Sequence, residues 1–356
     1  MDPNPEGSAP DNGYRGAHAA PRTYGGRILI STTVALLLVV VAAVGFSKHA
    51  AGTSSAANTP VAGTNPSATA PGTPTPSPSA SPPTPSPSAK PTPTATRTAT
   101  RSAPATHRAV TSARKGVGVW SFDGVSSALA QSGAGWYYTW STGHGGISTP
   151  PGVDFVPMVW GPDNTGNGTI HQLEHSGGKE LLGFNEPDLA SQSNMTVAQA
   201  LDLWPKLVST GLRLGSPAVA SGAATPGGWL DQFMTGAAAK GYRVDFITLH
   251  WYGGDFDTAD AVSQLRSYVQ AVYARYHKPI WLTEFALIDF SHGTRYPSEA
   301  QQAAFLTAAT AMLDGLPYLE RYAWFALPAS DDGPSTGLYH DGPEVTDVGR
   351  AFMAAH

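Results

Sequence analysis

From residue 116 onward, short runs of β-forming residues alternate with stretches that can form helices. The clearest helical stretches are residues 196–204, 258–276 and 297–313, and the first begins at a Thr suited to cap a helix. Strand and helix alternating in this way predict an α/β fold, a (β/α)8 or TIM barrel with parallel strands. The crossover after the second run is short on helix, and Pro157 interrupts the third run. The eight runs are residues 116–120, 136–140, 154–160, 181–185, 212–220, 244–252, 280–286 and 321–326.

Composition divides the chain into a leader and a compact domain. Residues 1–115 contain ten Lys and Arg and three Asp and Glu, whereas residues 116–356 contain eleven and twenty-three, a net charge of −12. All nine Trp lie in this second part. We therefore expect one domain over residues 114–356, a size that suits a single α/β barrel. Its negative charge disfavours nucleic acid as a partner, and the absence of Cys from the sequence excludes disulfides, thiolate nucleophiles and zinc–cysteine sites.

The leader contains three segments. Residues 1–27 are polar and are expected to be disordered and cytoplasmic, and residues 47–113, rich in Pro, Ser, Thr and Ala, are expected to form a disordered, extended linker. Residues 28–46 are nineteen positions without a charge that follow Arg22 and Arg27, which predicts a transmembrane signal anchor with its amino-terminus inside. A cleaved signal peptide is the alternative. Both interpretations place the acidic domain outside the cytoplasm, as a membrane-anchored or secreted protein.

Two glutamates lie in apolar runs that are typical of buried strands. Glu186 follows such a run and Asn185, and Pro187 ends the strand because it cannot donate to a sheet ladder. Glu284 lies in a similar run, residues 280–287. In a parallel α/β barrel the carboxyl ends of the strands carry the chemistry. Two carboxylates facing one pocket are typical of glycoside hydrolysis, where one protonates the leaving oxygen and the other attacks the anomeric carbon or activates water.

Polar and aromatic residues fall at the ends of the other predicted strands. His250 and Tyr252 end the sixth strand, and we expect Tyr252 to hydrogen-bond Glu284. Asn185 is expected to bind a sugar 2-hydroxyl. Aromatic faces at a cleft stack on the apolar faces of pyranose rings, so the strand-end aromatic residues are candidate sugar platforms. They are Trp120, Tyr138, Trp140, Trp160 and Trp324.

The whole series of motifs resembles a known family. The motifs are residues 116–120, 136–140, 155–160, 183–188, 250–252 and 281–285. Together they resemble the Asl1-like glycoside hydrolases of family 128, retaining (β/α)8 glycosidases of clan A, over about residues 116–355. The resemblance implies endo-β-1,3-glucanase activity or β-1,3-glucan binding. It also implies double displacement with retention, with Glu186 as acid/base and Glu284 as nucleophile. Asn185, His250 and Tyr252 would then support the subsite at the cleaved bond, and Trp324 would be a sugar platform.

Several structural interpretations compete with these roles. Glu186 alone could be a carboxylate that stabilises a helix start, and Glu284 alone could be a hydrogen-bonded polar residue on a strand. His250 could be a buried, hydrogen-bonded histidine, and each aromatic residue could belong to the core. Trp204 and Trp281 are assigned to packing.

Two other functional classes stay open. His171, Glu174 and His175 match the His-x-x-Glu-His zinc signature of a metalloprotease, but they lie between the third and fourth predicted strands, where a barrel has an outer helix. The second alternative is a non-catalytic β-glucan-binding or cell-wall protein on the same barrel. We expect no cofactor and no metal, a β-glucan polysaccharide or oligosaccharide as partner, membrane contact through residues 28–46 if they are uncleaved, and a monomer.

Overall fold

The computed structural model describes residues 109–331 and 333–356. The predicted transmembrane segment 28–46, the predicted cytoplasmic segment 1–27 and nearly all of the predicted linker lie outside these residues. Among the helices that the structure does describe, none combines the length and apolarity needed to cross a membrane.

The described residues confirm the predicted α/β fold with parallel strands. Six strands form one parallel sheet in the order β3-β2-β1-β8-β7-β6, and β4 pairs with β5 in a second parallel sheet. Isolated parallel bridges join Met158 to Leu182 and Gly215 to Phe246, which connects the two sheets on both sides. The parallel strands therefore close into a ring like that of a TIM barrel. These strands are β1 (Ser112–Gly118), β2 (Ala134–Tyr138), β3 (Asp154–Phe155), β4 (Glu180–Leu181), β5 (Arg213–Leu214), β6 (Ile247–Gly253), β7 (Ile280–Leu287) and β8 (Leu319–Trp324).

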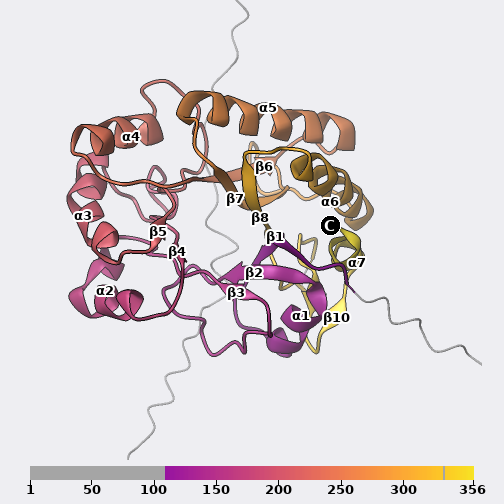
Figure 1. Ribbon diagram of the computed structural model, residues 1–356. Helices are drawn as coiled ribbons and strands as arrows, with labels where there is room; N and C mark the ends of the chain where they lie inside the picture. Colours follow the sequence, from indigo (N-terminus) through magenta and orange to yellow (C-terminus); the bar gives the residue numbers. More distant parts are fainter. Residues whose placement is uncertain (1–108, 332) are drawn as a thin grey trace, which may run out of the picture. The chain divides into compact units, whose positions relative to one another are not determined.

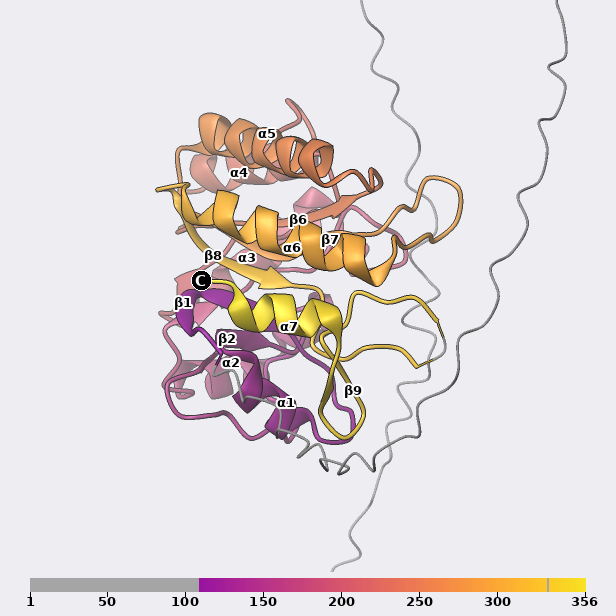
Figure 2. The same ribbon diagram turned by 90° about the vertical axis from the view of Figure 1, so that its right-hand side faces the viewer.

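Helices surround the strands on the outside (Figure 1). The neighbouring helices α5, α6 and α7 lie side by side along one flank (Figure 2). As the short crossover predicted, the described residues between β2 and β3 contain no helix. A small hairpin, β9 (Tyr339–His340) and β10 (Glu344–Val345), follows β8. The helices are α1 (Val125–Ser132), the 3-10 helix η2 (Pro162–Thr165), α2 (Asn167–Glu174), α3 (Val197–Ser209), α4 (Trp229–Ala239), α5 (Thr258–Tyr276), α6 (Glu299–Asp314) and α7 (Asp347–Ala354).

Local sequence signals account for the helix starts. Thr196 and Ser298 cap α3 and α6, and each accepts a hydrogen bond from the backbone N–H three residues later. Asp257 caps α5 in the same manner, with bonds from Ala259 and Asp260.

The first strand begins two residues earlier than the predicted domain boundary at 114. Ser112 already pairs with Ala134 of β2, so residues 112 and 113 belong to the barrel and not to the linker. Just inside this start, the fully buried Lys115 donates from Nζ to the carbonyl oxygens of Val110 (2.6 Å), Phe352 (2.9 Å) and Ala355 (2.6 Å). The beginning of β1 is therefore tied to the end of α7.

Aromatic side chains fill the inside of the barrel. Trp136, Phe246 and Trp281 pack there with smaller apolar residues, and Trp204 is buried in the outer layer between strands and helices. The predicted packing roles of Trp204 and Trp281 are therefore confirmed. Glycines of β1 leave room for this filling, since a Cβ on Gly118 would lie 2.5 Å from the ring of Trp140.

Candidate active site

Glu186 is held at the carboxyl end of β4 by backbone bonds to both neighbouring strand positions. The N–H of Asn185 donates to Trp160 (2.9 Å), and the N–H of Glu186 donates to Ala218 (2.7 Å). Glu186 is 3% exposed and has a φ of 41°, in the left-handed region. A non-glycine residue in that region costs about 1–3 kcal/mol, and such residues cluster at functional sites.

Glu284 is aimed into the same region by an irregularity in β7. His250 pairs with Glu284, whereas Leu249 pairs with Leu282, so Thr283 is an extra residue in the β7 ladder. Such a bulge bends a strand and redirects a side chain. The strand itself continues to Leu287, and all of its residues are buried.

Three side chains supply hydrogen bonds to the Glu284 carboxylate. Trp140 Nε1 donates to Oε1 at 2.8 Å, and the Tyr138 hydroxyl lies 3.3 Å from the same oxygen and 3.0 Å from the Thr283 carbonyl. Tyr252 donates to Oε2 at 2.5 Å, which confirms the hydrogen bond predicted between these residues. Both oxygens of Glu284 thus accept hydrogen bonds, the arrangement that stabilises an ionised carboxylate.

His250 lies between the two glutamates. Its Nδ1 is 2.8 Å from Oε1 of Glu186, and its Nε2 is 3.4 Å from Oε1 of Glu284. One carboxylate oxygen of each glutamate and a ring nitrogen of His250 all lie within 4.8 Å of one another. The three side chains therefore form one buried acidic cluster with an imidazole at its centre.

Burial and mutual charge shift the pKa values in this cluster. Burial raises the pKa of Glu284; the His250 charge opposes the shift, the Glu186 charge adds to it, and the bonds from Tyr252 and Trp140 oppose it. Burial lowers the pKa of His250, but the negative charges of Glu284, Glu186 and Asp188 outweigh it and leave the pKa raised. Burial next to these carboxylates also raises the pKa of Tyr252 far above its usual range, so its hydroxyl stays a donor.

Asn185 presents one free amide atom. Its Nδ2 donates to Oε1 of Gln192 at 3.2 Å, whereas its buried Oδ1 has no hydrogen-bond partner. A buried polar atom without a partner is costly, and a bound hydroxyl would satisfy it. Sequence reasoning did not single out Gln192, which lies in the loop after β4 with no motif to mark it.

Aromatic side chains form a surface beside the cluster. Trp120 is 40% exposed, and its ring centroid lies 5.9 Å from those of both Trp140 and Phe325. Trp160 is half-buried and packs with Trp140 on the aromatic filling of the barrel. Tyr138 is fully buried, and it therefore contacts Glu284 instead of presenting an open face.

The expectation that Trp324 is a sugar platform is wrong. Trp324 is fully buried, packs at 5.0 Å edge-on against Phe285, and donates from its indole N–H to the Thr336 carbonyl at 2.7 Å. Successive residues of a strand face opposite sides, and Trp324 faces the helix layer, where it also contacts Phe305 of α6. Phe325, the next residue, is the one that reaches the site.

The His-x-x-Glu-His residues lie away from this cluster. His171 and His175 are exposed and stack on each other at 4.4 Å at the end of α2, in the outer layer. Among residues 109–331 and 333–356, one group has the spacing to hold a metal ion, namely Glu186, His250 and Glu284. A cation there would have to displace the donors that already occupy Glu284.

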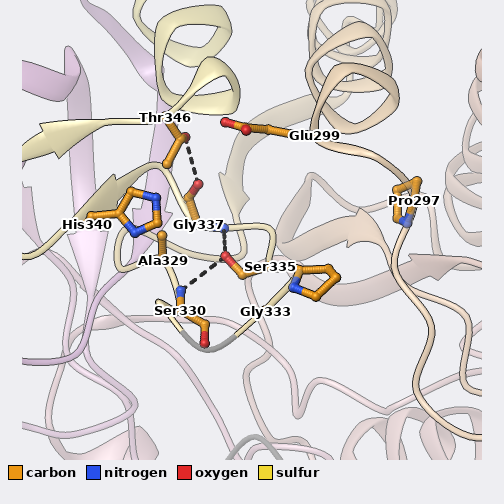
Figure 3. Close-up of a pocket in the computed structure, with 10 residues that line it drawn as sticks. Pro297, Glu299, Ala329, Ser330, Gly333, Ser335, Gly337, His340 and Thr346 are labelled. Atoms are coloured by element: carbon orange, nitrogen blue, oxygen red, sulfur yellow. Dashed lines mark hydrogen bonds between the residues drawn. The ribbon is translucent and has the colours of Figure 1, made fainter.

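A separate cavity of about 120 Å³ lies between the start of α6 and the loop after β8 (Figure 3). Glu299 and His340 line it, and Ser335 accepts hydrogen bonds from the N–H groups of Ser330 (3.2 Å) and Gly337 (3.0 Å). None of the predicted site residues lines this cavity.

The chain is similar to proteins of known class. Residues 117–352 match the family described as the glycosyl hydrolase catalytic core. The crystal structure of a family 128, subgroup I, endo-β-1,3-glucanase from Amycolatopsis mediterranei with laminaritriose has a TM-score of 0.66 and 56% identity, and the match covers 69% of this chain and 100% of that one. A subgroup II endo-β-1,3-glucanase from Sorangium cellulosum gives 0.58 and 31%, over 68% and 98% of the two chains. Alkali-sensitive linkage protein 1 of Schizosaccharomyces pombe is 31% identical over 242 residues, which are 65% of this chain and 42% of that protein.

Proposed function

The chain belongs to glycoside hydrolase family 128, within the glycosyl hydrolase catalytic core family, and we propose that it cleaves β-1,3-glucan internally with retention, using Glu186 and Glu284. The observation that carries the proposal is the buried cluster in which the two carboxylates approach within 4.8 Å across His250. Retaining glycosidases place their two carboxyl groups about 5–5.5 Å apart, and inverting enzymes need more room for a water molecule.

Glu284 is the proposed nucleophile. Its oxygens accept hydrogen bonds from Trp140, Tyr138 and Tyr252, which hold the carboxylate as an anion in a fixed orientation. One of these oxygens attacks the anomeric carbon and forms a glycosyl ester as the glycosidic C–O bond breaks.

Glu186 is the proposed acid/base. Within the part of the chain that the structure describes, its side chain has His250 as its hydrogen-bond partner through Oε1, which leaves Oε2 to face the leaving oxygen in the proposed mechanism. Glu186 gives a proton to the leaving oxygen in the first step. In the second step it takes a proton from water, which attacks the anomeric carbon and releases Glu284.

The remaining site residues would bind the glucan. Asn185 offers its unpaired Oδ1 to a sugar hydroxyl, in line with the expected contact to the 2-hydroxyl. The exposed face of Trp120, with Trp140 and Trp160 beside it, suits stacking on a pyranose ring. The subgroup I relative was crystallised with laminaritriose, which supports a laminari-oligosaccharide as ligand here.

The test is laminarin hydrolysis by the full chain, its Glu186→Gln and Glu284→Gln variants, and an EDTA-treated sample. We expect oligosaccharides from the unmodified protein only, with or without EDTA, and the β-anomer as the first product by NMR. Retention on insoluble glucan without any product would favour the binding-protein alternative. Activity that survives both substitutions would place the chemistry elsewhere, and loss of activity with EDTA would favour the metal-site alternative at His171 and His175.

The proposal includes an extracytoplasmic location and a monomer. The location rests on the nineteen uncharged residues 28–46 behind Arg22 and Arg27. Protease added to intact cells should remove the domain if it is anchored outside, and a cytoplasmic domain would survive that treatment.

A further inference from the structure

Phe325 touches the rings of three aromatic residues around the site. Its centroid lies 5.6 Å from Tyr252 at an interplanar angle of 86°, and 5.8 Å from Trp140 at 80°. Both are edge-to-face contacts, which contribute specific orientation as well as apolar burial. The third contact, to Trp120, is tilted at 5.9 Å.

Two of these three neighbours are hydrogen-bond donors to Glu284. Trp140 donates to Oε1 and Tyr252 donates to Oε2, so the donors reach opposite oxygens of one carboxylate. Phe325 therefore packs against both of these donor side chains, Trp140 and Tyr252. Phe290 packs on only one of the two donors, Tyr252, with a centroid distance of 5.5 Å and an interplanar angle of 81°.

The position of Phe325 is itself fixed by the loop after β8. Its N–H donates to Phe285 of β7 at 3.3 Å, and its carbonyl accepts a hydrogen bond from the Thr336 hydroxyl. The Thr336 carbonyl accepts from the buried indole of Trp324. Thr336 lies between Ser335 and Gly337, whose hydrogen bonds set the shape of this loop (Figure 3).

We propose that Phe325 is a positioning residue for Glu284, acting through Trp140 and Tyr252; this inference rests on the proposed role of Glu284 as nucleophile. Without the ring, the indole N–H and the phenol O–H can both tilt away from the carboxylate. The anion then loses stabilisation on both oxygens, while its burial stays the same. The chemical step slows, and the pH at which Glu284 becomes ionised rises.

The experiment compares Phe325→Ala, Phe325→Leu and Phe325→Tyr in the full chain, with Phe290→Ala as the matched control. Rates on laminarin are measured across the acid and neutral pH range. We expect Phe325→Ala to lower kcat about tenfold to a hundredfold and to move the acid limb of kcat upward by about half a unit to one unit. Phe290→Ala should move the limb less because it frees one donor only. Phe325→Tyr keeps the ring, so its acid limb should lie at the same pH as that of the unmodified protein. Phe325→Leu replaces Phe325→Ala in the comparison if the Ala variant does not fold.

Tyr252→Phe separates failure of this inference from failure of the proposed function. If Tyr252→Phe moves the acid limb and neither Phe325→Ala nor Phe325→Leu does, Phe325 does not position the nucleophile. A rise in KM alone in the Phe325 variants would make the residue a sugar platform and would also overturn the inference. If Tyr252→Phe also leaves the limb unchanged, hydrogen bonding from Tyr252 does not set the ionisation of Glu284 and the inference fails with it, whereas a Glu284→Gln variant that stays active overturns the proposed function itself. In the double variant Phe325→Ala, Tyr252→Phe, a shift of the acid limb smaller than the sum of the two single shifts would support action through Tyr252.

Discussion

Tyr252→Phe removes one hydroxyl group from the site and keeps the aromatic ring. That hydroxyl donates to Oε2 of Glu284 at 2.5 Å, whereas Trp140 and Tyr138 approach Oε1. The substitution therefore takes away the side-chain donor to one oxygen and leaves the donors to the other. The ring contacts to Phe290 and Phe325 stay in place.

The size and sign of the effect follow from this geometry. A hydrogen bond to a charged group contributes about 1.5–3 kcal/mol, and about 1.4 kcal/mol corresponds to one pKa unit. The Tyr252 bond stabilises the ionised form more strongly than the neutral form, so its loss raises the pKa of Glu284, in the direction in which burial already shifts it. In the proposed mechanism activity needs the anion, so it is lost as the pH falls through that pKa. We expect the acid limb to move up by about one unit, since water entering the vacated space restores part of the bond.

The assay follows the release of reducing ends from laminarin across the acid and neutral pH range. Tyr276→Phe is the matched control because it removes a hydroxyl that donates to the Ala223 carbonyl at 2.8 Å, in the outer layer. We expect the control to lower stability slightly and to leave the pH profile unchanged. An acid limb that is the same in Tyr252→Phe and in the unmodified protein would refute the idea that this bond holds Glu284 as an anion.

Three further predictions follow from the packing. Gly118→Ala places a methyl group 2.5 Å from the indole that donates to Glu284, so kcat should fall at least about tenfold, whereas Gly143→Ala, with open space around it, should not change kcat. Lys115→Met removes the ammonium that donates to three carbonyl oxygens and should lower the free energy of unfolding in denaturant by about 3 kcal/mol, and an unchanged midpoint would contradict this. The double variant His171→Ala, His175→Ala should hydrolyse laminarin at the rate of the unmodified protein, because both rings are exposed in the outer layer, and loss of activity with normal folding would revive the metal hypothesis.

The sequence predicts the order of strands and helices better than the length of the strands. The long apolar runs at 247–253 and 280–287 form full strands, but β3, β4 and β5 are reduced to two residues each. Prolines explain the reduction of β3 and β5, since Pro157 and Pro217 interrupt these two predicted runs and cannot donate to a ladder. The bridges at Met158 and Ala218 show that the chain still follows the strand direction beyond each proline.

The polar centre of the site could be predicted because each member follows an apolar run. Glu186 follows β4, whereas His250, Tyr252 and Glu284 lie within the last four residues of β6 and β7, and the ring brings these segments together. The aromatic surroundings could not be assigned in the same way. Trp324 and Phe325 are adjacent, so their side chains point to opposite sides of β8. Which of the two points toward the helix layer and which toward the site depends on the orientation of the strand, which the sequence does not show. The bulge at Thr283 likewise leaves no mark in the sequence, yet it sets the direction of Glu284.

The attachment of Val110 and Lys115 to α7 has a consequence for engineering. The N–H of Val110 donates to Met353 at 2.8 Å, so the first strand begins where the last helix ends, at the face opposite the carboxyl ends of the strands. A short peptide could join the two, which makes this barrel suitable for circular permutation with new termini in an exposed loop such as that around Gly143. Immobilising the domain on a resin by either of these ends would leave the carboxyl ends of the strands, where the candidate active site lies, turned toward the solution.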